Sequence, residues 1–429
     1  MSPIALAARS ALGLALTLGP FSAASARQLP ETLEQARATL HREGPAAALP
    51  ALETVLAAAR DAGDRVTEGA ALRALGGAYR ALDRIADARS ALERALEVTA
   101  QSGDALENGK ARNSLGLLEW QLGRYPQAII QLERAATRGR ELGEAELEGA
   151  ALSNLGLVRD ELGEYDRSRE LYRRALALYE RVGFERGTSD ALGNLGGVDL
   201  LLGRYADALE WYRRALEIGE RLGLGPSMSV DLLNIGFCHH GLGEYERAIE
   251  AFDRSLELAR SGELAWEEAD ALRGKATALA ALGRLEEALA LHRDALAAYQ
   301  RGGLRQPQVE ALAELGALHL SLGDVSAAEE SFQRGAALAR EIGNVRGVTS
   351  NLLALGAVEH RRGRLDPAAA LYREVTERAR EAGDGYHETL ARIELALVRR
   401  DQGGFELARR RWWRARCGRA ARPRGSPRR

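Results

Sequence analysis

The residues that could carry chemistry are few, and they gather at one place. The chain has 429 residues but only two cysteines and seven histidines, and the one cluster among them is Cys238-His239-His240. A thiol beside an imidazole could act as a nucleophilic pair, and the three side chains together could bind a metal ion. Either role requires the side chains to converge on one point. The element that carries them therefore decides whether they can act.

A helix would keep these three side chains apart. Neighbouring residues on a helix point about 100° from one another, whereas metal ligands come at positions i and i+4 or in separated pairs. A cysteine nucleophile would also need a distinct second domain to form an oxyanion hole, and the chain has no room for one. His239 shares its place in an internal repeat with Tyr, Glu, Arg and Asp, which predicts a tolerant, partly exposed position. We therefore predict no catalytic residue, no metal site and no cofactor.

Position and charge argue against two further functions. The glycine-rich run Gly193-Asn194-Leu195-Gly196-Gly197 falls in the middle of a predicted helix, not at the strand-to-helix turn that a phosphate-binding loop needs. The formal charge is −2 for the whole chain. Because Arg9 lies near the start and eight arginines without an acid follow residue 410, residues 27–410 carry −11. This acidic body argues against binding to nucleic acid.

The chain aligns with itself, without a gap, at a period of about 40 residues, the spacing from Leu75 to Leu115. One column is aliphatic in every row except that of Lys275, and it consists of Leu75, Leu115, Leu155, Leu195, Ile235, Leu315, Leu355 and Leu395. The next column is small, with glycine in most rows and Ala276 and Ala396 in two. Two more columns hold glycine, one from Gly63 to Gly383 and one from Gly123 to Gly403. Each unit thus has two glycine stops, with helical apolar spacing between them.

Every unit is therefore predicted to be two amphipathic helices joined by a tight turn. Neither helix can bury its apolar stripe alone, so neighbouring pairs must stack. The sequence predicts an all-α protein, an α-solenoid of about ten helix-turn-helix repeats over residues 27–410. A weaker pair before residue 74 caps the array. The small residue beside the aliphatic column is expected to let the two helices of a pair approach closely.

The repeat resembles the tetratricopeptide repeat, whose 34-residue signature runs W-x2-L-G-x2-Y, then A-x3-F, then P. The matching run is clearest at Leu192-x2-Leu195-Gly196, Tyr205, Ala208, Tyr212 and Ala215. The resemblance covers about residues 31–415. The period is longer, as in the bacterial and signalling branch of the family with N-L-G repeats, and glycine replaces the signature proline. The resemblance implies a right-handed superhelix whose concave face, lined by the first helix of each pair, binds a peptide or a partner protein.

A column of asparagines stands directly before the Leu-Gly or Ile-Gly pair, at Asn154, Asn194 and Asn234. Each lies on the flank of its helix, about 100° from the core leucine or isoleucine. An amide offers two donors and one acceptor, which suits the main chain of a bound peptide whatever its side chains. We predict that these three residues bind the partner in the groove. The alternative is that they bond to the next helix or face water.

The two ends of the chain differ from the repeats. Residues 1–26 have one basic residue, a short apolar run and small residues up to Ala26, the pattern of a secretory leader cleaved after Ala26. An uncleaved anchor or a misassigned start are the alternatives. No later segment is apolar enough to span a bilayer, so we expect an exported protein, periplasmic or extracellular. Residues 411–429 form a basic irregular tail, which is either native and bound to an anionic membrane or nucleic acid, or a truncated or frameshifted end.

The sequence thus predicts a protein-interaction scaffold that is not an enzyme. Two other hypotheses remain open. Bacterial arrays of this type often precede a caspase-like domain of the CHAT kind, so by resemblance the chain is similar to the repeat, or sensor, half of a truncated regulator. It could also be a structural spacer in the cell envelope. The pattern identifies neither the partner nor the pathway nor the oligomeric state.

Overall fold

The computed structural model describes residues 28–417, and every regular element in that range is a helix. The chain falls into two compact units, Met1–Val198 and Asp199–Arg429, which divide within α10 (Glu185–Leu201). The helices before α10 are α2 (Leu29–Arg42), α3 (Pro45–Ala62), α4 (Arg65–Ala81), α5 (Ile85–Ser102), α6 (Ala105–Gln121), α7 (Tyr125–Leu142), α8 (Ala145–Glu161) and α9 (Tyr165–Val182). Those after it are α11 (Tyr205–Leu222), α12 (Gly225–Gly241), α13 (Tyr245–Ser261), α14 (Ala265–Ala281), α15 (Leu285–Arg301), α16 (Arg305–Ser321), α17 (Val325–Glu341), α18 (Val345–Arg361), α19 (Leu365–Glu381) and α20 (Gly385–Cys417).

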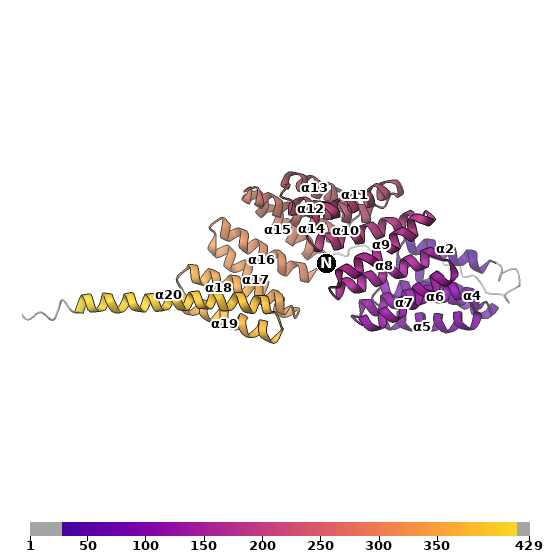
Figure 1. Cartoon of the computed structure of the whole chain (residues 1–429), viewed down its shortest axis with the longest axis horizontal. Helices are drawn as coiled ribbons and strands as arrows, with labels where there is room; N and C mark the ends of the chain where they lie inside the picture. The colour runs from indigo at the N-terminus through magenta and orange to yellow at the C-terminus, as the bar shows by residue number, and fades with distance from the viewer. Residues whose placement is uncertain (1–27, 418–429) are drawn as a thin grey trace, which may run out of the picture. The chain divides into compact units, whose positions relative to one another are not determined.

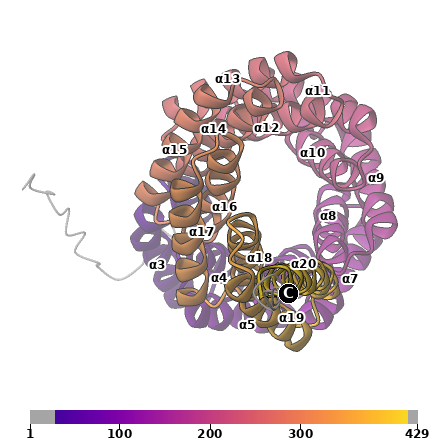
Figure 2. The ribbon, with the colours of Figure 1, turned by 90° about the vertical axis from the view of Figure 1, so that its left-hand side faces the viewer.

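Within each unit the helices form successive stacked pairs (Figure 1). An even-numbered first helix packs against the odd-numbered second helix that follows it, and the second helix packs against the first helix of the next pair. First helices also contact one another, as α6 contacts α8 and α12 contacts α14, and they lie on the inner side of each unit's curve (Figure 2). The predicted all-α solenoid of helical pairs is confirmed. None of the described helices is long and apolar enough to cross a membrane.

One large side chain from each second helix forms the centre of its pair. These residues recur once in each period and are buried, at Leu92, Leu132, Tyr172, Tyr212, Phe252, Phe332 and Tyr372. They lie over the small residue of the first helix: a Cβ added at Gly236 would stand 2.5 Å from the Phe252 ring. The expectation that the small column allows close approach is confirmed. In α15 this column holds His292 instead of an aromatic or leucine residue.

Glycines in the left-handed conformation end most of the helices, as the two glycine columns predict. At Gly243, φ is 76°, and the N–H of Glu244 donates to the carbonyl of His239 in a Schellman turn. Asp83 and Glu263 take the same conformation, with φ of 57° and 54°, in columns that hold glycine elsewhere. The fold therefore imposes this turn geometry even where the residue type does not favour it.

The prediction that the His239 column is partly exposed is wrong for most of its members. Tyr79 and Arg159 are half-buried, but the polar residues Glu119, Asp199, His239, His319 and Glu359 are buried. The Schellman backbone bond joins residues five apart, so it also brings their side chains together across the turn. Ion pairs with the residue five positions on form at Glu119–Arg124, Arg159–Glu164, Asp199–Arg204 and Glu359–Arg364, and His239 forms a hydrogen bond with Glu244 at the same spacing. The buried carboxylates of Glu119, Asp199 and Glu359 each have an arginine partner of this kind. In Arg159–Glu164 the arginine comes first and the acid second.

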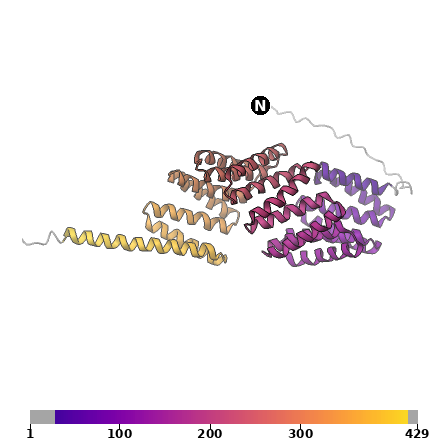
Figure 3. The same ribbon diagram turned by 45° about the horizontal axis from the view of Figure 1, so that its top comes forward.

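The last first helix departs from the pattern. Gly403 stands in the column that ends first helices, yet α20 continues through it to Cys417, past the end of α19 (Figures 1 and 3). The expected stop at Gly403 is therefore wrong. Gly404 follows where other turns carry Arg, Glu or Asp, and it offers no side chain to pair with Arg399. The helix includes residues 411–417 of the predicted tail. Residues 418–429 and the predicted leader, 1–26, lie outside the described residues.

Candidate partner-binding surface

The predicted asparagine column lies on first helices in both units. Asn154 and Asn194 belong to the first unit and Asn234 to the second, and all three are half-buried. The Nδ2 of Asn154 on α8 donates to the Oδ1 of Asn113 on α6, at 2.9 Å. Asn154 thus bonds to a neighbouring helix, the alternative considered for this column. A role in partner binding stays a prediction for all three residues.

The Asn113–Asn154 pair shows how neighbouring first helices meet. Its members are 41 residues apart, one more than the repeat. The same separation recurs in polar pairs along both units, at Arg80–Gln121, Arg273–Glu314 and His360–Asp401, with distances of 3.3, 3.2 and 3.0 Å. A residue on one first helix therefore contacts the residue one place further along the next. This ladder of side-chain pairs lines the inner side of each unit.

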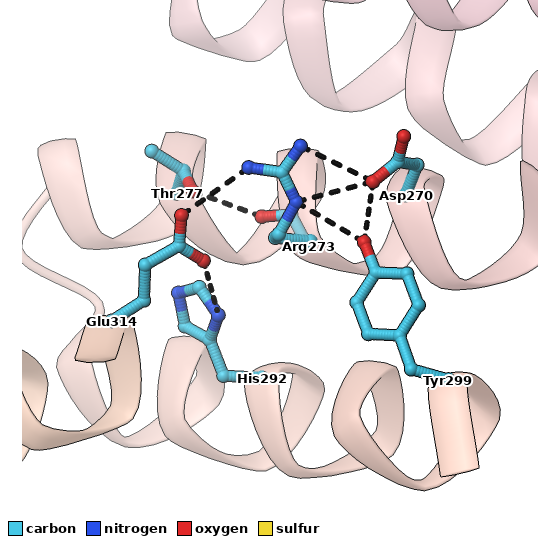
Figure 4. Close-up of polar contacts among 6 residues, drawn as sticks. All are labelled: Asp270, Arg273, Thr277, His292, Tyr299 and Glu314. Carbon is cyan, nitrogen blue, oxygen red and sulfur yellow. Dashed lines mark hydrogen bonds and ion pairs between the residues drawn. The ribbon is translucent and has the colours of Figure 1, made fainter. Parts of the chain in front are cut away.

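The most connected part of the ladder is a polar cluster on α14, α15 and α16 of the second unit, formed by Asp270, Arg273, His292, Tyr299 and Glu314 (Figure 4). The Arg273 guanidinium lies 3.2 Å from Asp270 Oδ1 through both Nε and Nη2, and 3.2 Å from Glu314 Oε1 through Nη1. Tyr299 is buried and donates its hydroxyl hydrogen to Asp270. One arginine thus joins the carboxylates of two successive first helices.

Burial and pairing act on Arg273 in opposite directions. Burial alone would lower the pKa of Arg273, but the carboxylates of Glu314 and Asp270 outweigh it and raise the pKa. Burial also raises the pKa of Glu314, and the neighbouring Arg273 offsets part of that effect. The cluster is therefore held by charge pairing inside a poorly solvated site, where an unpaired member would be costly.

His292 completes the cluster from the second helix. It occupies the column of the central aromatic residue and is buried. Its Nδ1 lies 3.6 Å from Glu314 Oε2, and neither atom has a hydrogen-bond partner within the described part of the chain. Burial first, and then the charge of Arg273, lower the pKa of His292 to about 4. The imidazole is therefore neutral at neutral pH.

A groove adjoins the cluster on the inner side of the second unit. This inner groove has a cavity of about 380 Å³ between α16, α18 and α20. Its polar lining includes Gln306, Glu310, Glu314, Asn344, Arg346, Ser350, Asn351 and His387. These residues come from three successive first helices and the turn before α18. Such a surface can donate to and accept from a polypeptide main chain at several points along its length.

The Cys238 cluster does not have the geometry of a reactive site. Cys238 is buried, and burial raises its thiol pKa to about 12, so the nucleophilic thiolate is scarcely populated at neutral pH. His239 is turned to Glu244, with Nδ1 and Oε2 2.6 Å apart. Over residues 28–417 the structure shows no group of three or more His, Cys, Asp or Glu placed to hold a metal ion.

The polar cluster was not singled out from the sequence. The sequence carries two signals of it, and the first is Lys275, the only interruption of the aliphatic column. Lys275 lies in the same pair of helices and itself bonds to Asp253 Oδ1, at 2.6 Å. The second signal is His292, which stands in the column of the central aromatic residues in that same pair. The contact between Arg273 and Glu314 depends on their offset of 41 residues, which the period of the repeat does not reveal.

The fold and this inner surface define a class of protein, the helical-repeat solenoid with a polar inner face. A comparison with protein families places the chain within that class. One model described as tetratricopeptide repeat matches residues 107–181 and 187–261, and a second model of the same description matches residues 269–302. The chain is a tetratricopeptide repeat protein. A comparison with curated protein sequences gave no match.

Several solved structures share the fold at low sequence identity. The apo form of the quorum sensor NprR from B. thuringiensis is 16% identical, with a TM-score of 0.61, covering 82% of this chain and 99% of that one. A signal-transduction ATPase of the STAND class with a tetratricopeptide repeat sensor, from Pyrococcus horikoshii, is 15% identical with a TM-score of 0.64, covering 85% and 55%. A Rap protein complexed with competence and sporulation factor is 17% identical with a TM-score of 0.51, covering 79% and 99%. At these identities the likeness concerns the fold alone.

Proposed function

We propose that this protein is a non-enzymatic scaffold that binds an extended segment of a partner protein in the inner groove of its second unit. The observation that carries the proposal is the groove itself, in which three successive first helices present amide, hydroxyl and charged side chains to one cavity. The repeat family supports it, because such solenoids use their inner surface for binding. A Rap protein of the same fold is known in complex with competence and sporulation factor, which supports a binding role for this architecture.

The spacing of the helices fits an extended chain. Packed helices lie about 8 to 10 Å apart, and an extended chain advances about 3.3 Å per residue, so a segment of about six residues spans three first helices. Each helix would then meet every third residue of the segment. Main-chain groups of the partner would bond to Ser350 and Asn344, and the carboxylate of Glu310, which is exposed, would select a donor or a basic side chain.

Site-specific crosslinking tests this proposal. A photoreactive benzoylphenylalanine replaces Glu310 in the inner groove, and in a second variant it replaces Glu330 on α17. Glu330 is the matched control because it is a well-exposed glutamate of the same unit that does not line the groove. Irradiation in the native cell should give a discrete partner adduct from position 310 only. Adducts of equal yield at both positions, or at position 330 alone, would contradict the groove assignment.

The asparagine column provides a separate test of the sequence prediction. Once a partner is identified, its dissociation constant is compared for the wild type and an Asn154→Ala, Asn194→Ala, Asn234→Ala variant that circular dichroism shows to be folded. If the column binds the partner, affinity falls by about tenfold or more, because several main-chain hydrogen bonds are lost. An unchanged affinity would leave Asn154 and its two counterparts as packing residues.

A second function is favoured by one comparison. The chain covers 55% of a signal-transduction ATPase of the STAND class that has a tetratricopeptide repeat sensor. By this analogy the array would be the sensor part of a larger regulator, as in the CHAT-linked arrays that the sequence resembles. In that case the coding region would continue in frame, past residue 429, into an effector domain. Sequencing the transcript beyond this point separates the two functions.

Export remains part of the proposal. The leader pattern ending at Ala26 predicts that the mature protein acts outside the cytoplasm. Amino-terminal sequencing of protein purified from the native host tests this, and a start at Arg27 is the expected result. A start at Met1 or Ser2 would contradict cleavage and favour a different location.

A further inference from the structure

Arg112 interrupts a column of buried leucines in the first unit. The position belongs to the core face of the first helices, and its buried counterparts are Leu72, Leu152, Leu192, Leu232, Leu272, Leu312 and Leu352, while α20 carries a second arginine there, the exposed Arg392. Arg112 on α6 is only half-buried, and it carries a guanidinium where the buried counterparts carry an aliphatic group. A charge taken partly out of water is stable only where it finds a partner.

The partners that Arg112 finds on the chain are neutral. Its Nε donates to Asn108 Oδ1 at 3.0 Å, and its Nη1 donates to Gln131 Oε1 at 3.1 Å. No carboxylate pairs with it among residues 28–417. The two amide oxygens orient the guanidinium between α6 and α7, but they do not neutralise it. The remaining N–H groups are left to face the adjoining space.

That space is a cavity of about 440 Å³ that three arginines share. Its lining is Arg112, Ile130, Glu133, Arg134, Thr137, Arg138 and Glu141. Arg138 pairs with Glu141 at 3.0 Å, whereas Arg134, like Arg112, has no carboxylate partner in the described part of the chain. Gly109 lets the Arg138 stem lie across α6, since a Cβ there would stand 3.1 Å from its Cγ.

Positive charge at this place is under-compensated. Burial is the main cause that lowers the pKa of Arg112, and the like charges of Arg134 and Arg138 lower it further. A bound anion would relieve both effects, because it would replace lost hydration and screen the three guanidinium groups from one another. The carboxylate of Glu133 on the same wall limits the net positive charge of the lining.

We propose that the cavity between α6 and α7 is a binding site for a phosphate-type oxyanion, held by Arg112 and Arg134 with the Thr137 hydroxyl as a further donor. The planar guanidinium of Arg112, already oriented by Asn108 and Gln131, presents its free N–H groups to two oxygens of the ion. The anion is either a free ion or the phosphoryl group of a partner. This site is separate from the inner groove of the second unit and does not depend on it.

Thermal unfolding of the full chain tests the proposal, with inorganic phosphate as the probe and sodium chloride keeping the ionic strength constant. The decisive variant is Arg112→Leu, which restores the residue of the column and is expected to fold. At about ten times the dissociation constant, phosphate should raise the wild-type midpoint by about 3 °C and leave that of Arg112→Leu unchanged. Arg134→Ala should lose most of the rise as well.

Arg94→Ala is the matched control. Arg94 stands in the column of Arg134 on the preceding second helix, but it pairs with Glu97 at 2.7 Å and does not line the cavity. This control should keep the full phosphate response. The proposal is overturned if phosphate does not raise the wild-type midpoint, or if Arg112→Leu responds as the wild type does, since the rise would then be a general salt effect.

A second titration identifies the source of the anion. A short capped phosphoserine peptide is compared with inorganic phosphate by calorimetry on the wild type and on Arg112→Leu. A dissociation constant at least about tenfold lower for the peptide assigns the site to a phosphorylated partner segment. Equal constants, lost together in Arg112→Leu, assign it to a free ion. Heat that is the same for both proteins overturns the site.

Discussion

The two units place different chemistry at the same point of the repeat. In the first unit, Asn113 and Asn154 join two first helices through a neutral amide hydrogen bond. In the second, Arg273 and Glu314 occupy the corresponding positions and join two first helices through an ion pair, tied further to Asp270 and Tyr299. The helices and their offset are the same in both cases. The repeat therefore fixes where two side chains meet. The residue types alone decide how much that contact contributes to stability and which groups it can bind.

Loss of Arg273 should have the largest effect. Arg273→Ala leaves Asp270 and Glu314 poorly solvated without a cation, so the free energy of unfolding of the second unit should fall by about 3 kcal/mol. Urea unfolding followed by circular dichroism measures it. Arg254→Ala removes a solvent-exposed pair with Glu220 and serves as the control, with little expected change. A similar small loss for both variants would show that the cluster contributes no more to the free energy of unfolding than a surface ion pair does.

Acid should weaken the second unit through His292. Its pKa is about 4 in the folded protein against an ordinary 6.5, so between these values the unfolded chain binds more protons. Stability is therefore full above about pH 6.5 and is lost as the pH falls, by about 2.5 kcal/mol at pH 4.5. The raised pKa of Glu314 has the opposite effect, because the folded protein then binds this proton more readily than the unfolded chain and gains stability as the pH falls.

The variant His292→Phe isolates this contribution. Phenylalanine is the residue of the same column in α13 and α17, so it should be accommodated. Urea midpoints at about pH 7 and about pH 4.5 should differ less for His292→Phe than for the wild type. Equal acid sensitivity of the two proteins would mean that other groups cause the loss.

The amide pair of the first unit should matter less. Asn113→Ala removes the acceptor of a half-buried, neutral hydrogen bond, and the free energy of unfolding should fall by about 1 kcal/mol. Asn154→Ala should cost about the same, and the double variant little more than either alone, because both remove one interaction. Additive losses would show that the two residues stabilise the protein independently, which would weaken the comparison with Arg273 and Glu314.

The smallest effect is expected at two strained turns, one in each unit. Glu263→Gly and Asp83→Gly relieve a left-handed conformation that is unfavourable for a residue with a Cβ, so thermal unfolding should show a gain of about 0.5 kcal/mol. The gain should be larger for Glu263, because aspartate tolerates this conformation better. A loss of stability in both variants would indicate that the native side chains contribute contacts that outweigh the strain.

Most of the fold could be predicted because it depends on residues that repeat. The aliphatic column from Leu75 to Leu395 and the two glycine columns contain the information for stacked helical pairs, and the structure confirms them. The stop at Gly403 was wrong because a glycine permits a turn without enforcing it. The turn after α14 forms although Leu279 faces Arg284, so the cross-turn ion pair is also not required. At Gly403 and Gly404 the sequence supplies no charged residue that could pair with Arg399 across a turn and no residue that restricts the backbone, and the helix continues.

The polar surface was harder to predict because it depends on departures from the repeat. A column of mixed residue types suggests a tolerant, partly exposed position, and that reasoning misplaced Glu119 and His239, which are buried. His239 is bonded to Glu244, five residues away across the turn, a contact created by the Schellman geometry. Glu119 is paired with Arg124 across the turn and also with Arg89 on α5. Arg273 and Glu314 likewise meet only because the first helices are offset by one residue. Neither relation follows from the period alone.

The offset of 41 residues between ladder partners has a consequence for transplanting parts of this array. A segment of one period is the unit of the sequence, but it contains only one member of each ladder contact. Moving the α14–α15 pair into another array would carry Arg273 and leave Glu314 behind. The smallest portable module is therefore a helical pair together with the first helix of its successor, and chimeras cut at that boundary would keep their inner surface intact.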